Sequence, residues 1–133
     1  MNQKQTGPTE MGIVHSTIRM LIPKGKQSEA LEILQAACAQ TQVEPNCIST
    51  HLYRGVDDLR AVMVEERWAS DEDVMRHLRS EVYRRILLVM EMAEEPPEIL
   101  FDVISNSTGI EKIEKAIHGT HKFNGRSLPV IDG

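Results

Sequence analysis

A histidine and the only tryptophan of the chain lie close together among residue types that suit proton transfer. Trp68 ends an apolar stretch, and His77 follows nine residues later, behind a run of acidic residues. A neutral imidazole near pH 7 can accept a proton from a bound molecule. A tryptophan can stack against a flat ring. The pair is therefore a candidate site, with His77 as the candidate base.

The same side chains can instead have structural roles, and the sequence leaves both possibilities open. Trp68 can serve as an anchor in the core or in a subunit interface, where aromatic residues are common. His77 can cap a helix or bond a neighbouring carboxylate such as that of Glu66. Tyr83 follows on the same helical stretch, and its hydroxyl can donate a hydrogen bond to a developing oxyanion.

Two further histidines lie on predicted strands. The period of two places His15 on the same face as Arg19, and His51 on the same face as Tyr53. We take His15 and His51 as candidate substrate-binding residues, together with Trp68 and Tyr83. The alternative is a polar network between subunits, for example an Arg19–Glu65 pair.

The sequence contains no recognisable motif for binding a cofactor or a metal. His118 and His121 have HxxH spacing, but they lie in a tail and lack the helical HExxH context. Cys38 and Cys47 do not form a CxxC pair, and we expect them to be reduced thiols. The glycines of the expected turns are isolated, so a phosphate-binding loop has no motif either. We therefore predict neither a cofactor nor a metal.

The elements that must position these residues follow from periodicity and turn signals. Ser28, Ser70 and Ser80 are candidate N-caps, and Ser80 leaves open whether the later helical stripe is one helix or two. Strands are expected at 13–22, 47–54, 60–68 and 98–105, and helices at 28–42 and from 71 to about 93. This order is that of an α+β, ferredoxin-like split βαβ fold (βαββαβ), with a four-stranded antiparallel sheet and both helices on one face.

The chain is expected to divide into a flexible arm (1–12), a ferredoxin-like domain (13–105) and a C-terminal extension (106–133). The extension begins with a short amphipathic helix at about 110–117, which is marginal alone and must dock somewhere, followed by a loose tail. The open face of the sheet carries apolar residues among polar ones and is too apolar for water. We therefore expect a homodimer that buries two such faces. The apolar residues expected on this face include Ile13, Leu21 and Met63.

Composition narrows the classes of partner. With 133 residues, the chain suits one domain, and its net charge of −5 provides no positive field for nucleic acid or an anionic membrane. No segment approaches the roughly 18 apolar residues of a membrane span. The N-terminus lacks the apolar core of a signal peptide, so we expect a cytoplasmic protein.

Three motifs in register carry a resemblance to a known family. Ile22-Pro23-Lys24-Gly25 follows the first strand, Glu44-Pro45-Asn46-Cys47 precedes the second, and Glu66-x-Trp68-x-Ser70 leads to His77-x-x-Ser80. Over residues 13–105 the chain resembles the antibiotic-biosynthesis-monooxygenase (ABM)-like domains. The resemblance implies a dimeric α/β barrel. Some members are cofactor-free oxygenases of quinols, anthrones and other electron-rich aromatics, some degrade haem, and many have no assigned activity.

The same resemblance argues against haem degradation. The haem-degrading relatives place a tryptophan where His77 stands and a ligating histidine about ten residues later. By that register this chain has Leu87, which cannot ligate iron.

Two hypotheses of function remain. One is a cofactor-independent monooxygenase that oxidises a small aromatic substrate between sheet and helices. The other is a non-catalytic dimeric barrel that binds a small ligand or a protein partner. An enclosed pocket beside His77, with Trp68 or Tyr83 on its wall, favours the enzyme. A His77 packed against Glu66 without a cavity favours the alternative.

Overall fold

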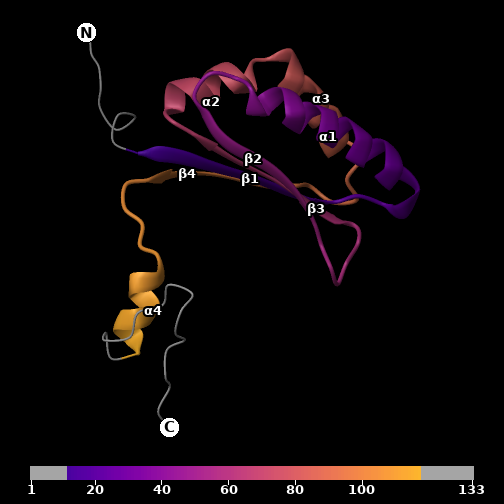
Figure 1. Cartoon of the computed structure of the whole chain (residues 1–133). Helices are drawn as coiled ribbons and strands as arrows, with labels where there is room; N and C mark the ends of the chain where they lie inside the picture. Colours follow the sequence, from indigo (N-terminus) through magenta and orange to yellow (C-terminus); the bar gives the residue numbers. More distant parts are fainter. Residues whose placement is uncertain (1–11, 118–133) are drawn as a thin grey trace.

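The computed structural model describes residues 12–117, and its order of elements is the predicted one (Figure 1). Nearly all of the expected N-terminal arm, the tail, and the HxxH pair at 118–121 lie outside the described residues. The elements are β1 (Ile13–Leu21), the 3-10 turn η3 (Lys24–Lys26), α1 (Gln27–Gln42), β2 (Cys47–Arg54), β3 (Ala61–Trp68), α2 (Asp71–Leu78), α3 (Glu81–Met90), β4 (Glu98–Ile104) and α4 (Ile110–Ala116).

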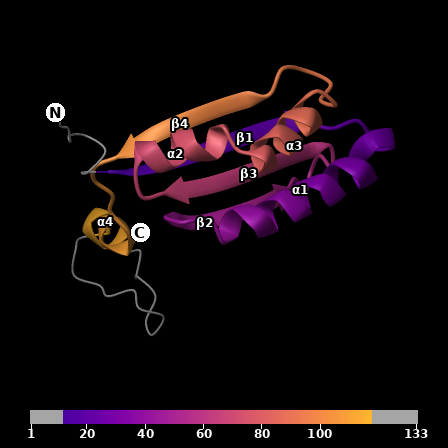
Figure 2. The same cartoon turned by 90° about the horizontal axis from the view of Figure 1, so that it is seen from above.

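The four strands form one antiparallel sheet in the order β2-β3-β1-β4. Helices α1, α2 and α3 lie together over one face of this sheet, as both views show (Figures 1 and 2). Helix α4 lies beyond the end of β4, on the other side of the sheet (Figure 1). This arrangement confirms the predicted ferredoxin-like α+β fold.

The core lies between the sheet and its three covering helices. Alternate residues of β1, such as Val14 and Ile18, are buried, which confirms the predicted period of two. The main cluster joins the sheet to α1 and α3 and includes Ile18, Leu34 and Ile86. A second, smaller cluster of Val14, Trp68 and Val74 lies under α2. Helix α2 therefore covers the second cluster, and its last residue, Leu78, packs against both clusters.

Two serine caps divide the second helical region. The Ser70 hydroxyl accepts from the Asp73 amide, and the Ser80 hydroxyl accepts from the Tyr83 amide. The region is therefore two helices, one of the two possibilities that the sequence left open. The expected Ser28 cap is wrong, because η3 runs directly into α1 and the Gln27 amide bonds the Lys24 carbonyl.

The uncovered surfaces of the sheet carry apolar side chains. Strand β4 is exposed along most of its length, with Leu100 on the helix-free face and Phe101 on the helix side. The helix-free face also presents Ile13. Whether a second copy covers this face stays a prediction. Within residues 12–117, none of the helices has the length and apolar character that crossing a membrane requires.

Candidate functional site

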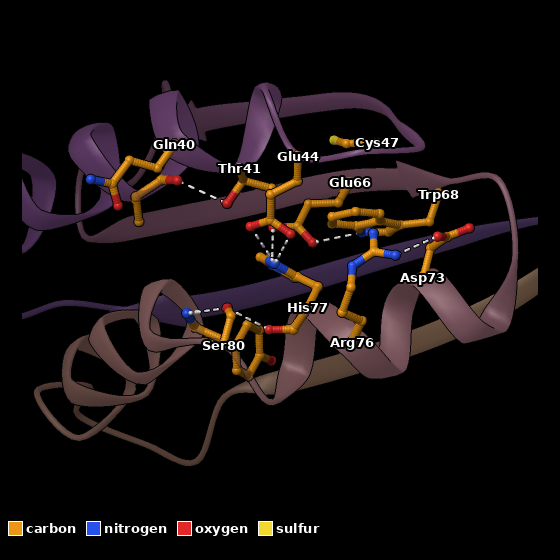
Figure 3. A network of polar contacts seen from close by, with 12 residues as sticks. Gln40, Thr41, Glu44, Cys47, Glu66, Trp68, Asp73, Arg76, His77 and Ser80 are labelled. Carbon is orange, nitrogen blue, oxygen red and sulfur yellow. Dashed lines mark hydrogen bonds and ion pairs between the residues drawn. The ribbon is translucent and has the colours of Figure 1, made fainter.

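Strand β3 supplies two residues of the candidate site, both on the face under the helices. Glu66 is 3% exposed and Trp68 is fully buried. The Trp68 indole Nε1 donates to the Glu66 carboxylate oxygen Oε1 at 3.0 Å. Because strand side chains alternate in direction, the two residues share a face, and this bond fixes one carboxylate oxygen of Glu66 (Figure 3).

Helix α2 brings His77 between two carboxylates, as Figure 3 shows. Its Nδ1 lies 3.1 Å from Oε2 of Glu44, which belongs to the turn between α1 and β2. Its Nε2 lies 3.4 Å from Oε2 of Glu66, in a geometry that is not that of a hydrogen bond. The imidazole ring is 4.7 Å from the Trp68 ring and 5.3 Å from the Tyr83 ring, measured between centroids.

These surroundings perturb the titration of two groups. Burial by itself lowers the pKa of His77, but the carboxylates of Glu66 and Glu44 outweigh it, so that the pKa is raised. Burial raises the pKa of Tyr83 to about 12, and the charge of Glu66 adds to this effect. Tyr83 therefore remains a hydrogen-bond donor at neutral pH, and His77 holds a proton more strongly than an exposed histidine.

Three buried polar atoms of this region have no hydrogen-bond partner among the described residues. They are Thr50 Oγ1, Glu66 Oε2 and His77 Nε2. Thr50 lies directly opposite Glu66 across the β2–β3 ladder, on the same face. Buried polar atoms are normally satisfied, because an unmade hydrogen bond costs about 1–3 kcal/mol. Two of these atoms, Glu66 Oε2 and His77 Nε2, face each other as an ion pair at 3.4 Å, and the Thr50 side chain interacts with the Cys38 thiol of α1.

The structure brings together only part of the predicted site. His77 contacts both Trp68 and Tyr83 on the helix side of the sheet. His15 and His51 lie on the opposite face. His15 pairs with Arg67 and His51 pairs with Glu65, and paired residues of an antiparallel ladder share a face. Their roles as substrate-binding residues stay predictions, and they cannot contact the same molecule as His77 within one protomer.

The opposite face carries polar contacts within the protomer. His15 Nε2 lies 2.8 Å from the Glu65 carboxylate, and the Tyr53 hydroxyl lies 3.5 Å from its other oxygen. Arg19 pairs with Glu98 at 3.5 Å. The Arg19–Glu65 pair was expected between subunits, and it stays a prediction.

Two residues of the candidate site were missed by sequence reasoning. Glu44 was noted only as part of a turn, and its contact with His77 joins positions 33 residues apart. Thr50 carried a detectable signal, because the period of two on its strand places it on the buried face. Glu44 had no such signal, because no local sequence pattern shows that a residue of this turn will contact a helix 33 residues later.

Access to this site is closed in the described residues. His77 is 1% exposed and packs against Glu66. The hollows described within residues 12–117 are lined by other residues, including one of about 200 Å³ beside Arg19 and Tyr53. This geometry meets the condition that favours the non-catalytic alternative, unless the covering helix moves.

Comparison with known proteins bears on the fold and the family. Rv0793 from Mycobacterium tuberculosis superposes with a TM-score of 0.66 and 21% identity, over 73% of this chain and 99% of that chain. A conserved protein from Methanosarcina mazei Go1 superposes with a TM-score of 0.65 and 19% identity, over 70% of this chain and 93% of that chain. The structure of an antibiotic biosynthesis monooxygenase superposes with a TM-score of 0.64 and 14% identity, over 72% of this chain and 99% of that chain. At these identities the likeness shows the fold.

A comparison with curated proteins finds no match. The model of one protein family, described as antibiotic biosynthesis monooxygenase, matches residues 11–87, which is more than half of the 133 residues. The matched region runs from β1 into α3 and includes Trp68, His77 and Tyr83. The chain therefore belongs to the antibiotic biosynthesis monooxygenase family.

Proposed function

We propose that this protein is a cofactor-independent monooxygenase that oxidises a small, electron-rich aromatic substrate of the quinol or anthrone type. The observation that carries the proposal is the buried pair of His77 Nε2 and Glu66 Oε2, 3.4 Å apart, in which the His77 ring lies against the rings of Trp68 and Tyr83. Polar atoms next to aromatic rings suit a substrate that has both a hydroxyl group and a flat ring.

In this proposal, the neutral form of His77, which forms as the pH rises above its raised pKa, accepts the phenolic proton of the substrate at Nε2. The resulting anion transfers electrons to dioxygen, and a bond forms between the ring carbon and one oxygen atom. For an anthrone-type substrate the ring methylene becomes a carbonyl, and the second oxygen atom leaves as water with the two methylene hydrogens. The substrate supplies all the electrons, and His77 returns its proton to the leaving oxygen.

Residues around His77 have supporting roles. Glu44 holds the Nδ1 side of the imidazole, which leaves Nε2 directed at the Glu66 carboxylate. Tyr83, with its raised pKa, is a hydrogen-bond donor for the developing oxyanion. Trp68 is the aromatic wall. The cytoplasmic location expected from the sequence remains part of the proposal.

A homodimer belongs to the same proposal. Members of this family are typically dimeric. The helix-free face of the sheet supports dimerisation here, because Leu100 is 59% and Ile13 is 37% exposed on it. Covering such residues removes apolar area from water, which favours association at about 25 cal/mol per Å².

The closed packing of His77 favours a second candidate function. In this alternative the protein is a non-catalytic barrel that binds a small ligand or a protein partner, and the Glu44–His77–Glu66 cluster only orders the interior. The supporting observation is the 1% exposure of His77, with both ring nitrogens next to carboxylates.

Measuring oxygen uptake with a panel of quinols and anthrones distinguishes the monooxygenase from the non-catalytic barrel. We expect uptake by the wild type and a loss of at least about 100-fold in His77→Gln, as for removal of a general base. Met75→Ala, on the exposed side of the same helix, is the control and should retain its rate. Circular dichroism and thermal melting check that His77→Gln is folded. No uptake by the wild type with any substrate, or equal rates for His77→Gln, would leave the non-catalytic function.

A further inference from the structure

Helix α2 is the cover of the candidate site. His77 lies against the Trp68 ring, and Val74 packs on the same tryptophan from one turn earlier. Trp68 is fully buried beneath them. A substrate that is to reach Glu66 from this side must therefore pass α2.

The turn between α1 and β2 holds this helix by three polar contacts, one from each of its consecutive residues. The Glu44 carboxylate meets His77 Nδ1 at 3.1 Å. The Pro45 carbonyl accepts from Arg76 Nη2 at 2.7 Å, and the Asn46 side-chain amide donates to the Asp73 carboxylate at 3.1 Å. Arg76 also contacts Asp73 at 2.8 Å, as Figure 3 shows. The contacts of Arg76 and Asp73 with the turn are therefore connected, and together with the Glu44–His77 contact we call them the latch.

The turn is the fixed side of this latch. Asn46 has a φ of 65°, in the left-handed region that asparagine tolerates better than most residues. The Asn46 carbonyl accepts from the Ala69 amide at 3.0 Å, which ties the turn to the end of β3. The Cys47 amide bonds the Glu44 carbonyl at 3.2 Å. Backbone contacts therefore hold the turn in place independently of α2.

The helix is the side that can move. It has only eight residues, and a capping serine precedes it at Ser70 while another, Ser80, begins α3. Its apolar anchor, Val74, belongs to the small cluster with Val14 and Trp68. The main cluster joins α1 and α3 to the sheet, and α2 contributes to it through its last residue, the partly buried Leu78. Segments with few buried apolar contacts open at lower free energy than the core.

We propose that α2 is a hinged gate, latched to the Glu44–Pro45–Asn46 turn, which opens to admit the substrate to the buried carboxylate of Glu66. The identity of what enters rests on the proposed monooxygenase function, whereas the gate itself does not. Ser70 and Ser80 mark the hinges. Opening carries His77 away from the site, and closing returns it to the bound substrate and excludes water.

Hydrogen exchange of the full chain tests the gate without a substrate. In the wild type, the amides of α2 should exchange faster than those of the buried face of α1. Arg76→Met removes the contacts to Pro45 and Asp73, and should raise exchange in α2 by about 3- to 10-fold while α1 stays unchanged. Arg85→Met is the matched control, because Arg85 links α3 to Gln40 of α1 through a 2.9 Å bond and does not touch the latch.

The sole tryptophan provides a second readout. Acrylamide quenching of Trp68 should rise in Arg76→Met and stay at the wild-type value in Arg85→Met, because only the first variant frees the helix above it. Equal exchange of α1 and α2 in all three proteins, or equal effects of the two variants, would overturn the gate. Absence of oxygen uptake would overturn the proposed function alone, since neither readout depends on catalysis.

Discussion

Replacing Glu66 by glutamine should change the pH dependence of stability. Glutamine has nearly the same shape, and its amide oxygen can still accept from Trp68 Nε1, as Glu66 Oε1 does at 3.0 Å. Its amide nitrogen would then face His77 Nε2 in place of the carboxylate oxygen that lies 3.4 Å away. A donor in this place disfavours the protonated imidazole, so we expect the variant to lower the pKa of His77.

The size and the sign of the change in stability follow from the buried pair of Glu66 and His77. Unit charges 3.4 Å apart attract by about 5 kcal/mol at an effective dielectric constant near 20, and the cost of desolvating them offsets part of this. We expect a net loss of about 2 kcal/mol for Glu66→Gln at pH 6. The folded-state pKa of His77 is raised, so its contribution is complete below about pH 6.5 and is lost as pH rises through the folded value.

Urea unfolding at pH values from about 5.5 to 8.5 measures the effect, with histidine NMR to follow His77 directly. The difference between wild type and Glu66→Gln should shrink as pH rises, by at most about 1.4 kcal/mol per pH unit for one proton. Glu65→Gln is the control, because it makes the same change at the next residue, on the other face. It should cost less than about 1 kcal/mol, since the Glu65 side chain is partly exposed. A difference for Glu66→Gln that is equal at both ends of the pH range would refute the reasoning.

Three further predictions concern the fold and the assembly. Ser70→Ala removes the cap of α2 and should lower the free energy of unfolding by about 1 kcal/mol in urea; an unchanged midpoint contradicts the role of the cap. Leu34→Ala opens a cavity in the main cluster and should cost about 2–5 kcal/mol by the same assay, with a loss below about 1 kcal/mol as the contrary result. Leu100→Lys should shift sedimentation from dimer to monomer, whereas Leu87→Lys, on an exposed position of α3, should not; a dimer unaffected by Leu100→Lys places the interface elsewhere.

The fold was predictable because its signals are local. The alternation of buried and open positions along β1 follows from the pleat alone, and the caps at Ser70 and Ser80 follow from hydroxyl groups placed before helical stripes. The early part of α1 was less predictable. A 3-10 turn precedes that helix and supplies its first backbone bond, so that Ser28 lies inside the helix and does not cap it.

The site was predictable only in its aromatic half. Trp68 and His77 are close in sequence and stay close in space, since one ends a strand and the other lies on the helix that follows. Glu44 reaches the same point from a turn 33 residues away, and only the packing of α2 over the sheet brings it there. His15 and His51 were grouped with the site by residue type, although the pleat places them on the other face.

The energetic cost of the Glu66–His77 pair bears on which of the two functions is correct. Replacing a buried ion pair by apolar residues of similar volume is often neutral or stabilising, so a core that only has to pack gains nothing from a carboxylate at this position. Here Glu66 has one oxygen bound to Trp68, and its other oxygen lies beside His77 without a hydrogen bond. A buried ion pair beside two aromatic rings is costly for a scaffold and useful for moving a proton to or from a hydroxylated ring. For this reason the enzyme remains the better proposal despite the closed packing of His77.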